Sequence, residues 1–506
     1  MRYAVTAEQM KAADAGTIRG LGIPSLVLME RAALQCVAAM KEAGVDLKRA
    51  LIVCGSGNNG GDGFAIARLL AEEGFMPDVV LAGNPASRSE ETKAQMQILE
   101  KMGIPVGNSL PDGEYSVIID AVFGIGLSRE IEGRYAEVIR RMNAYRGYKV
   151  AVDTPSGVCS DTGRILGCAF RADLTVTFAY PKAGQIFYPG CEYAGKLDIR
   201  PIGIADQSLP EREDVYYLLE PPDLAVRMPR RMADSHKGTY GKLLVIAGSR
   251  GMSGAAYLSA RAAYTAGAGL VRIYTEESNR TTLQTLLPEA VMTTYDGDAA
   301  EPLRELPALL DWADAVCLGC GLGKGEVSRR IVETVVRENK KPCVVDADGL
   351  NLLAELGEAA WTQMCERADY VFTPHMLEMA RLTGHTVAEL KEKRTVLLRE
   401  VVSQWKVVCA LKDSRTLVAS AGAPVFLNTA GNAAMAKAGA GDVLAGTIAG
   451  LLAQGLGARE AADTGVYLHG CGGDAARERL GAYSVLAGDI IDGIGRTLTT
   501  LEEQQR

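Results

Sequence analysis

The chain has 506 residues, which is too long for one domain of ordinary size and suits two. Apolar residues make up 48% and charged residues 23%, a composition typical of a globular protein and not of a disordered one. The formal net charge of −8 argues against the basic surface that binding to nucleic acid or to an anionic membrane requires.

The N-terminus contains Glu8 and Asp14 and no uninterrupted apolar run, so we expect no signal peptide. No stretch approaches the roughly 20 apolar residues that span a bilayer. The 11 cysteines are scattered, and the single Cys-x-x-Cys, Cys317 to Cys320, has no second pair to complete a zinc site. We therefore expect ordinary buried thiols and a cytoplasmic location, where thiols stay reduced.

The first part of the chain alternates apolar strands with amphipathic helices. We predict helices over 64–74 and 87–103, and strands over 50–54, 78–83, 116–124, 149–157 and 173–180. Near-continuous apolar strands that alternate with helices indicate a parallel sheet with helices on both faces. The expected fold of this block is a Rossmann-like three-layer α/β sandwich.

A glycine-rich loop, GSGNNGGDG (55–63), follows the first of these strands and opens a helix. Gly55, Gly57 and Gly60 satisfy the pattern Gly-x-Gly-x-x-Gly, and the amides at a helix N-terminus favour an anionic phosphate. The pattern alone is weak evidence for a dehydrogenase. The next strand ends in Ala82, Gly83 and Asn84, without the acid that would hold a ribose.

Oxygen-bearing side chains follow several of the predicted strands. The glycine loop carries Asn58, Asn59 and Asp62; Asp120 ends the third strand, and Asp153 and Ser156 follow the fourth. Because the carboxyl ends of neighbouring parallel strands converge on one crevice, these oxygens suit a hard cation next to a phosphate. The alternative is that they only cap helices and brace turns.

Between about 205 and 235 the chain becomes rich in proline and charge, and we place the domain boundary there, giving domains 1–215 and 221–506. The second block is predicted to contain a helix over 439–455 and strands over 241–249, 270–275, 313–321, 341–349, 369–375 and 406–414. The two halves share the α/β class but no repeated motif, so we expect two different α/β domains.

The second block has no Gly-Lys-Ser/Thr ending after its glycine turns, which excludes a Walker nucleotide site. Its informative segment is AKAGAGDVLAG (436–446). Gly439, Gly441 and the helix that follows form an amide cradle for anions, with Asp442 in the first helical turn. A carboxylate there can take a proton from a hydroxyl while the amides stabilise a transferring phosphoryl group. The alternative is an aspartate that merely favours the helix dipole.

The N-terminal motifs GSGNNGGDG, DAVFGIGLSRE (120–130) and VDTPSG (152–157) resemble the epimerase domain of the NAD(P)H-hydrate repair enzymes, over most of 1–215. The resemblance implies that Asp153 binds the substrate and acts in proton transfer. It further implies potassium ligation by Asn59, Asp120 and Ser156. The other implied substrate-binding residues are Asn58, Asn59, Gly60, Gly61, Asp62, Gly124, Ile125, Gly126, Leu127, Ser128, Arg129 and Glu130.

The second block resembles the dehydratase domain of the same family, which is related to ribokinase-like kinases. The motifs are GSRGMSGAA, GCGLG, VVDADGLNLL (344–353), TPHMLEMARL (373–382), LKDSRTLV (411–418) and GAGDVLAG. The resemblance implies that Gly254, Gly321, His375 and the catalytic Asp442 contact the hydrated nucleotide. It implies that Lys412, Asp413, Ser414, Arg415, Thr416 and Gly441 hold the adenine nucleotide.

Two departures from the family pattern affect loops of this second block. Cys320 replaces the usual proline of Gly-Pro-Gly-Leu-Gly, and KDSRT replaces the commoner Lys-Gly-x-x-Thr. Neither removes a proposed reacting group. His375 follows an apolar strand and Pro374 at the crevice edge, although a core imidazole is the alternative. The remaining histidines, His236, His385 and His469, show no metal-ligand spacing and receive no role.

The family resemblance implies a bifunctional enzyme that acts on hydrated NADH and NADPH (NADHX and NADPHX). The N-terminal domain would interconvert the R and S hydrates with K⁺ bound. The C-terminal domain would dehydrate the S hydrate with Mg²⁺ and ADP, giving AMP and phosphate. The fused arrangement favours ADP over ATP, and we expect a homo-oligomer. The alternatives are a ribokinase-like small-molecule kinase fused to a nucleotide-binding module, and an N-terminal half that is a nucleotide sensor or partner-binding module.

Overall fold

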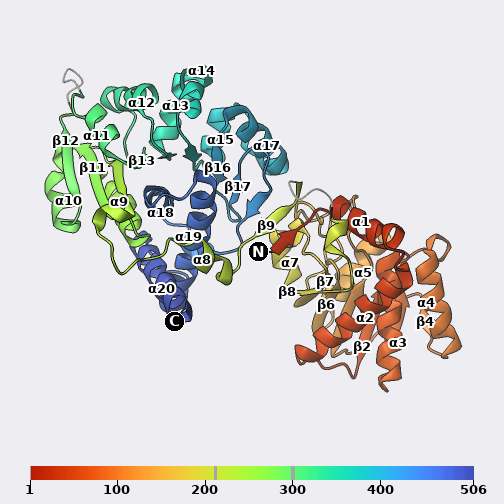
Figure 1. Ribbon diagram of the computed structural model, residues 1–506. Coiled ribbons are helices and arrows are strands. Elements are labelled where there is room, and N and C mark those ends of the chain that lie inside the picture. The colour runs from red at the N-terminus through yellow and green to blue at the C-terminus, as the bar shows by residue number, and fades with distance from the viewer. Residues whose placement is uncertain (1, 210–213, 298–302, 506) are drawn as a thin grey trace. The chain divides into compact units, whose positions relative to one another are not determined.

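The computed structural model describes residues 2–209, 214–297 and 303–505 (Figure 1). The chain divides into two compact units: an N-terminal unit, Tyr3–Tyr216, and a C-terminal unit from Tyr217 onward together with Arg2. Strands β1 (Arg2–Ala4) and β9 (Tyr216–Leu218) each have residues on both sides of this division. Of the predicted linker 205–235, residues 210–213 lie outside the described residues.

The N-terminal unit contains one parallel sheet. Its strand order is β4 (Val106–Gly107), β3 (Asp78–Leu81), β2 (Ala50–Cys54), β5 (Val117–Ala121), β6 (Tyr148–Val152), β7 (Leu174–Phe178) and β8 (Lys196–Arg200). The strands predicted from apolar runs are confirmed. The sequence prediction missed β4, which has two residues, and β8, whose residues are only partly buried.

Helices cover both faces of this sheet, because alternate strand residues point to opposite sides. On one side, Ile52 and Cys54 share a core with α2 (Ser25–Glu42), α3 (Asn58–Glu72) and α4 (Glu90–Lys101). On the other side, Leu51 and Val53 share a core with α5 (Gly133–Ala144). The predicted three-layer sandwich is therefore confirmed. The unit also contains α1 (Ala7–Ala15), the π-helix η1 (Gly16–Gly20), η2 (Pro85–Ser87), α6 (Ala183–Ile186), α7 (Gly190–Ala194) and η3 (Asp206–Ser208).

The sheet of the C-terminal unit is mostly parallel. Its order is β18 (Val425–Leu427), β17 (Leu417–Ala419), β16 (Val408–Leu411), β15 (Tyr370–Phe372), β14 (Cys343–Val345), β13 (Ala315–Leu318), β10 (Lys242–Ile246), β11 (Leu270–Glu276) and β12 (Val291–Tyr295). The β16–β17 and β17–β18 pairs are antiparallel. The prediction found β10, β11 and β13–β16 but missed β12, β17 and β18.

The helix that begins at the predicted amide cradle, α18 (Ala440–Ala453), is buried on all sides from Val443 to Ala453. It packs against α9 (Ser253–Thr265), α19 (Ala458–Leu480) and strands β10, β13 and β14. An all-round apolar helix of this kind belongs inside a core. The other helices are α8 (Pro221–Arg227), α10 (Arg280–Leu286), α11 (Leu306–Trp312), α12 (Glu326–Glu338), α13 (Asp348–Leu356), α14 (Glu358–Trp361), α15 (Met376–Thr383), α16 (Val387–Glu392), α17 (Arg394–Trp405), α20 (Ala487–Gln505), η5 (Lys237–Tyr240), η6 (Glu277–Asn279), η7 (Thr362–Glu366) and η8 (Ala433–Met435).

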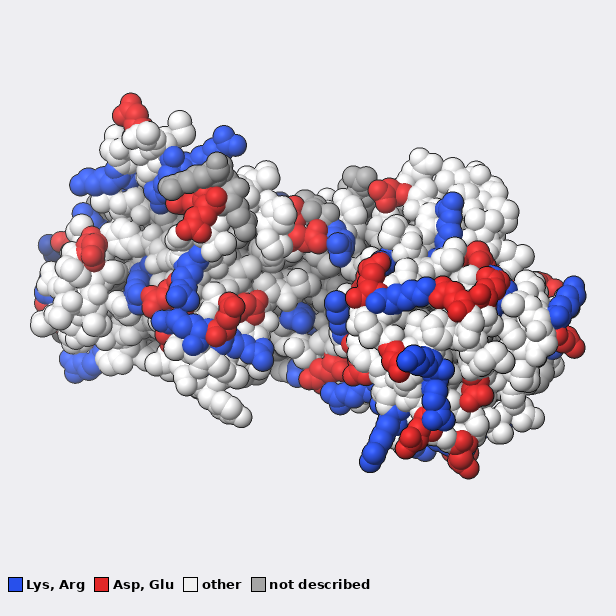
Figure 2. Space-filling view, turned by 90° about the horizontal axis from the view of Figure 1, so that it is seen from below, with Lys and Arg blue, Asp and Glu red and all other residues white. Residues whose placement is uncertain are grey.

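On the face that Figure 2 shows, acidic and basic side chains of the described residues are interspersed. In the part of the chain that the structure describes, no helix combines the length and apolar character needed to cross a bilayer. All 11 cysteines are free thiols, and most are buried, as the sequence predicted.

Candidate active sites

The glycine loop of the N-terminal unit is held tightly against the end of β5. A Cβ on Gly55 would lie 1.9 Å from the carbonyl oxygen of Val122, and a Cβ on Gly60 would lie 1.9 Å from that of Gly55. Only glycine fits at either position. The loop therefore turns directly from β2 into α3, which begins at Asn58.

Beside this loop is a cavity of about 520 Å³ in the N-terminal unit. The predicted residues that line it are Asn58, Asn59, Asp62, Gly124, Ile125, Gly126, Leu127, Ser128, Arg129 and Asp153. Gly60, Gly61 and Glu130 belong to the same segments but do not line it. The first two are buried within α3. The structure thus brings the three N-terminal motifs together around one cavity.

Asp153 is the most constrained carboxylate of this cavity. Its backbone φ is 62°, in the left-handed region. Its side chain forms an ion pair with Lys182, whose side chain is 1% exposed and whose ammonium also donates to Thr177 Oγ1 at 2.9 Å. Gln185 Nε2 donates to the Asp153 carbonyl oxygen at 2.5 Å. Lys182 therefore compensates the charge of Asp153 inside the protein.

Beneath the cavity, Asp120 is fully buried and accepts hydrogen bonds from Ser156. Ser156 Oγ donates to Oδ1 at 2.7 Å, and Ser156 N donates to Oδ2 at 2.7 Å. Burial raises the pKa of Asp120 to about 6, although these hydrogen bonds lower it. Asn59 lies at the same end of the sheet, and both its side-chain polar atoms are buried without a hydrogen-bond partner among the described residues. A buried amide without a protein partner is the kind of group that an ion or an ordered water satisfies.

Four charged residues of this cavity were not predicted from the sequence: Lys11 and Asp14 on α1, Glu91 on α4, and Lys182 just before α6. Neither their spacing in the sequence nor the composition around them marks these residues as part of a site. Burial raises the pKa of Asp14, and the charges of Asp153 and Glu91 add to the rise. The cavity therefore concentrates acidic groups that sequence motifs only partly reveal.

In the C-terminal unit, the loops after the parallel strands meet at one edge of the sheet. Ser249 N donates to the Gly321 carbonyl at 2.7 Å, which brings the loops after β10 and β13 into contact. A Cβ on Gly321 would lie 2.7 Å from the Cβ of Ala255. Gly254, by contrast, faces open space, because a Cβ added there would have no described atom within 4 Å. The predicted residues Gly254 and Gly321 therefore lie close together, where the loops after β10 and β13 meet.

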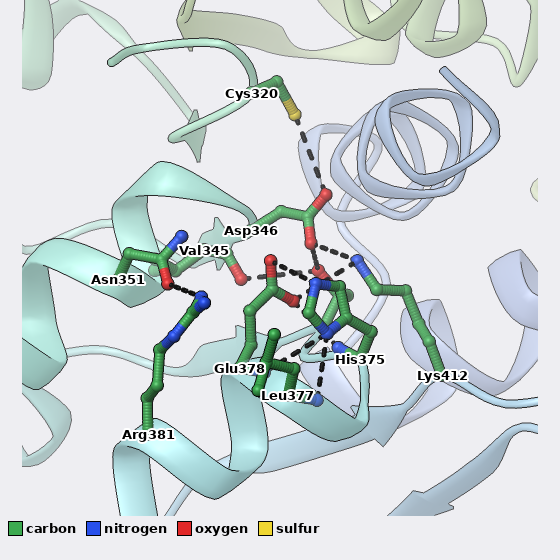
Figure 3. A network of polar contacts seen from close by, with 10 residues as sticks. Cys320, Val345, Asp346, Asn351, His375, Leu377, Glu378, Arg381 and Lys412 are labelled. Atoms are coloured by element: carbon green, nitrogen blue, oxygen red, sulfur yellow. Dashed lines mark hydrogen bonds and ion pairs between the residues drawn. The ribbon is translucent and has the colours of Figure 1, made fainter. Parts of the chain in front are cut away.

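A polar network connects the strands β14, β15 and β16 at the same edge (Figure 3). Lys412 Nζ lies 2.5 Å from Asp346 Oδ1, and Thr373 Oγ1 donates to the same oxygen at 2.8 Å. Lys412 Nζ also lies 3.9 Å from Glu378 Oε2. Burial lowers the pKa of Lys412, but the charges of Asp346 and Glu378 raise it by more. The pKa of Lys412 therefore lies above its ordinary value.

Asp442 lies in the first turn of α18, next to this network. Burial raises its pKa to about 6; Asp346 adds to the rise, and Cys320 and Lys412 oppose it. One ligand atom each from Cys320, Asp346 and Asp442 all lie within 4.8 Å of one another. Cys320, which replaces the family's proline, thus lies beside both carboxylates.

His375 caps the N-terminus of α15. Leu377 N and Glu378 N donate to its Nδ1, at 3.1 and 3.2 Å, which leaves the proton on Nε2 facing Glu378 Oε1 at 3.3 Å. The imidazole is 48% exposed. The alternative of a core imidazole does not fit this exposure.

The predicted adenine-nucleotide segment forms the turn between β16 and β17. Thr416 Oγ1 donates to the Asp413 carbonyl at 3.4 Å, Ser414 N donates to Asp413 Oδ1 at 2.8 Å, and Arg415 donates to the Thr429 carbonyl at 3.2 Å. A Cβ on Gly441 would lie 3.4 Å from Lys412 Nζ. The turn and the start of α18 are therefore adjacent.

The sequence analysis missed two carboxylates of this site, Asp346 and Glu378. Asp346 directly follows β14, and the convergence of parallel strand ends could have identified it. Glu378 is 5% exposed, and its contact with Lys412 joins residues far apart in the chain. His469 also lies close by: burial lowers its pKa to about 4, a hydrogen bond with the Ala440 backbone opposes this, and its Nε2 has no partner among the described residues.

Comparison with known proteins assigns each unit to a family model. A model described as YjeF-related protein N-terminus matches residues 25–184, and one described as NAD(P)H-hydrate dehydratase matches residues 243–496. The chain is 37% identical to a bifunctional NAD(P)H-hydrate repair enzyme of Moorella thermoacetica, over 99% of this chain and 98% of that protein.

Solved structures resemble the C-terminal part. A protein of Streptococcus mutans with no assigned function is 29% identical, with a TM-score of 0.50, and covers 56% of this chain and 99% of its own. An ADP/ATP-dependent NAD(P)H-hydrate dehydratase of Bacillus subtilis, co-crystallised with ATP and Mg²⁺, is 32% identical with a TM-score of 0.49. It covers 56% of this chain and 97% of its own.

Proposed function

Because the chain belongs to the family of bifunctional NAD(P)H-hydrate repair enzymes, we propose which of its residues carry each of the two activities. The enzyme combines an epimerase with a nucleotide-dependent dehydratase. Its substrates are the hydrates of NADH and NADPH. The N-terminal unit interconverts the R and S hydrates, and the C-terminal unit dehydrates the S hydrate. The proposed domain limits are 1–215 and 221–506.

The observation that carries the dehydratase assignment is the position of Asp442. Its carboxylate lies at the N-terminus of a buried helix, beside Asp346 and Lys412. Hydroxide is a poor leaving group, since the pKa of water is near 15.7, whereas phosphate leaves with a pKa near 6. In the proposed step Asp442 takes the proton of the substrate hydroxyl while that oxygen attacks the terminal phosphoryl group of the nucleotide. The P–O bond to the rest of the nucleotide breaks as the phosphate ester forms. Loss of phosphate from C6 together with a proton from C5 then restores the C5–C6 double bond of the nicotinamide ring.

Lys412 and the turn that follows it are proposed to hold the nucleotide. The ammonium of Lys412 lies at the start of α18, where the amides of Gly441 and its neighbours favour phosphate oxygens. Gly254, Gly321 and His375 are proposed to contact the hydrate, and Asp413, Ser414, Arg415 and Thr416 to contact the adenine nucleotide. The exposed edge of His375 and the open space around Gly254 leave room for such a ligand.

Mg²⁺ is expected with the nucleotide, because the transferring phosphoryl group carries charge that must be neutralised. The carboxylate of Asp346 would hold this hard cation, whereas the thiol of Cys320 does not suit it. Mg²⁺ supplies neutralisation of the phosphate charge; proton transfer remains with Asp442.

For the epimerase, Asp153 and its partner Lys182 are proposed to act at the cavity of the N-terminal unit. A potassium ion fits the set Asn59, Asp120 and Ser156, because the buried oxygen of Asn59 lacks a partner among the described residues and the set contains only one carboxylate. A divalent ion usually gathers more carboxylates. Potassium would supply a fixed positive charge next to the substrate-binding loop.

Of the nucleotides, we propose ADP, which gives AMP and phosphate, on the resemblance to fused two-domain members of the family. The alternative of a small-molecule kinase is disfavoured by the epimerase-type family match at 25–184, which it leaves unexplained. A homo-oligomer and a cytoplasmic location are proposed on the same resemblance and on the free thiols.

The test is a turnover assay with both hydrate epimers and purified ADP or ATP, followed by the recovery of reduced-nicotinamide absorbance. AMP should appear in step with NADH when ADP is supplied. A stable phosphorylated product would support the kinase instead, and ligand binding without turnover would support a sensor. Expression of 1–215 and 221–506 as separate fragments, with a melting curve and both assays for each, tests the domain limits.

A further inference from the structure

The cavity of the N-terminal unit contains three aspartates in different surroundings: Asp14 on α1, Asp62 on α3 and Asp153 after β6. Asp153 is paired with the buried ammonium of Lys182. Asp62 has neither a hydrogen-bond nor an ion-pair partner among the described residues, although it lines the same cavity. Asp14 likewise has neither kind of partner among the described residues. The cavity thus holds one compensated aspartate, Asp153, and two uncompensated ones, Asp14 and Asp62.

The surroundings of Asp62 favour its neutral form. Burial raises the pKa of Asp62 well above its ordinary value, and the charges of Asp153 and Asp14 add to the rise. The titratable and charged groups around it include Lys11 and Asp14 on α1, Cys36 on α2, Cys54 on β2, Glu91 on α4, Arg129 after β5, Asp153 after β6 and Lys182 before α6. Among the described residues no cation forms an ion pair with Asp62, and the buried cation Lys182 is engaged by Asp153. Two carboxyl groups whose environments differ in this way form a proton donor and a proton acceptor.

Resting on the proposed epimerase function, we propose that Asp62 is the proton donor that releases the hydroxyl group of the hydrate. The hydroxyl is attached to C6, next to the ring nitrogen N1. The N1 lone pair forms a C6–N1 double bond as the C6–O bond breaks, and the departing oxygen takes the proton of Asp62 and leaves as water. A water molecule then adds to the opposite face of C6. The electron pair returns to N1, and the proton of that water passes to a carboxylate of the cavity.

This sequence balances without an oxidant or a cofactor. One C–O bond breaks and one forms, and one proton leaves Asp62 and one returns to the cavity. Asp153, as a carboxylate fixed by Lys182, is placed to accept the proton of the entering water. Asp62 acts as the donor because, among the described residues, no cation forms an ion pair that would hold its carboxyl group in the charged form.

The first experiment compares the wild-type chain with Asp62→Asn, with Asp14→Asn and with the exposed control Asp112→Asn, in the absence of nucleotide so that only epimerisation is observed. The amide of Asp62→Asn keeps the shape but cannot donate a proton as a carboxylic acid does. We expect the epimerisation rate to fall by about 10²–10⁴-fold, the usual contribution of a general acid. Asp112→Asn should match the wild type, and a larger loss in Asp14→Asn than in Asp62→Asn would overturn the choice of Asp62. A wild-type rate in folded Asp62→Asn would overturn the assignment.

A second experiment tests the broken bond and does not depend on any variant. In water labelled with heavy oxygen, wild-type turnover should place the label at C6 of the product epimer, at one oxygen per inversion. Inversion without label would show that the ring opens at N1–C6, and the proposal would be wrong. An infrared spectrum should also show the carbonyl band of a neutral carboxylic acid at neutral pH, absent in Asp62→Asn; the absence of this band from the wild type would equally contradict it.

These outcomes distinguish a failure of the proposed epimerase function from a failure of the role proposed for Asp62. If the wild-type chain does not interconvert the epimers at all, the proposed function fails and this inference with it. If the wild type interconverts them but Asp62→Asn does so equally well, only the role of Asp62 is overturned. A melting curve of each variant confirms that a lost activity is not a lost fold.

Discussion

Lys412 Nζ lies 2.5 Å from Asp346 Oδ1 and 3.9 Å from Glu378 Oε2, so this ammonium is held between two buried carboxylates. The sequence assigned Lys412 only to nucleotide binding. Its position also gives it electrostatic influence over Asp442, the proposed base, since its charge opposes the rise in the pKa of that carboxyl group.

Replacing Lys412 by methionine should therefore change the pH dependence of dehydration as well as its rate. Without the ammonium, the pKa of Asp442 rises above about 6, so a larger fraction of the base is protonated near neutral pH. The measurement is kcat/KM against pH for the wild type, Lys412→Met and Lys412→Arg. The acid limb should move upward for the methionine variant and much less for arginine, which keeps the charge. An unmoved limb in Lys412→Met would contradict this electrostatic coupling.

Asp442→Asn should abolish dehydration while epimerisation continues. Loss of a general base costs about 10²–10⁴ in rate. In the wild type, dehydration should fall as the pH drops through about 6, because the raised pKa means that Asp442 becomes protonated there and can no longer accept a proton. The control is Asp311→Asn, an exposed carboxylate on α11. Dehydration at the wild-type rate by folded Asp442→Asn would remove Asp442 from the mechanism.

Lys182→Met should destabilise the N-terminal unit, because it leaves the carboxylate of Asp153 without its buried counter-charge. Breaking one partner of a buried pair costs about 3–5 kcal/mol. Denaturant unfolding monitored for this unit is the measurement, with exposed Lys196→Met as the control. The double variant Lys182→Met with Asp153→Asn should recover most of the loss. If the double variant is as unstable as the single one, the ion pair is not the cause.

Epimerisation should depend on K⁺, and Asp120→Asn should weaken that dependence. The variant keeps the size of the side chain but removes the one carboxylate of the set with Asn59 and Ser156. The assay is the epimerisation rate against KCl concentration, at ionic strength held constant with choline chloride. Half-saturation should need more K⁺ in Asp120→Asn, whereas exposed Asp112→Asn should match the wild type. Full wild-type activity without K⁺ would leave Asp120 with a purely structural role.

Local patterns predicted most of the fold. The apolar runs at 50–54 and 241–249 correspond to β2 and β10 because a fully buried parallel strand must be apolar on both faces. β8 and β12 were missed because their residues are only partly buried and include Lys196, Asp198 and two threonines, so no continuous apolar run marks them. The β17–β18 hairpin was also missed; its strands have three residues each, as do β14 and β15, which were found.

The candidate sites were predicted unevenly for a similar reason. Glycine motifs, the strand-end Asp120 and the helix-start Asp442 can be recognised from local sequence. Lys182 cannot, because its role comes from contact with Asp153, 29 residues earlier in the chain. Likewise, the contact between Lys412 and Asp346 joins residues that are 66 positions apart. Contacts of this kind depend on how the strands align in the folded sheet. A local sequence pattern does not determine that alignment.

The left-handed backbone of Asp153, with φ at 62°, has a consequence for directed evolution of this enzyme. A non-glycine residue in this region costs roughly 1–2 kcal/mol, and removing both partners of a buried ion pair avoids the cost of about 3–5 kcal/mol that an unpaired buried charge carries. The double variant Asp153→Gly with Lys182→Met should therefore melt close to the wild-type temperature and have no epimerase activity. A library screened for heat resistance alone would retain such inactive clones, so each round of selection must include hydrate turnover. Calorimetry of the double variant and of the wild type measures the difference between their melting temperatures.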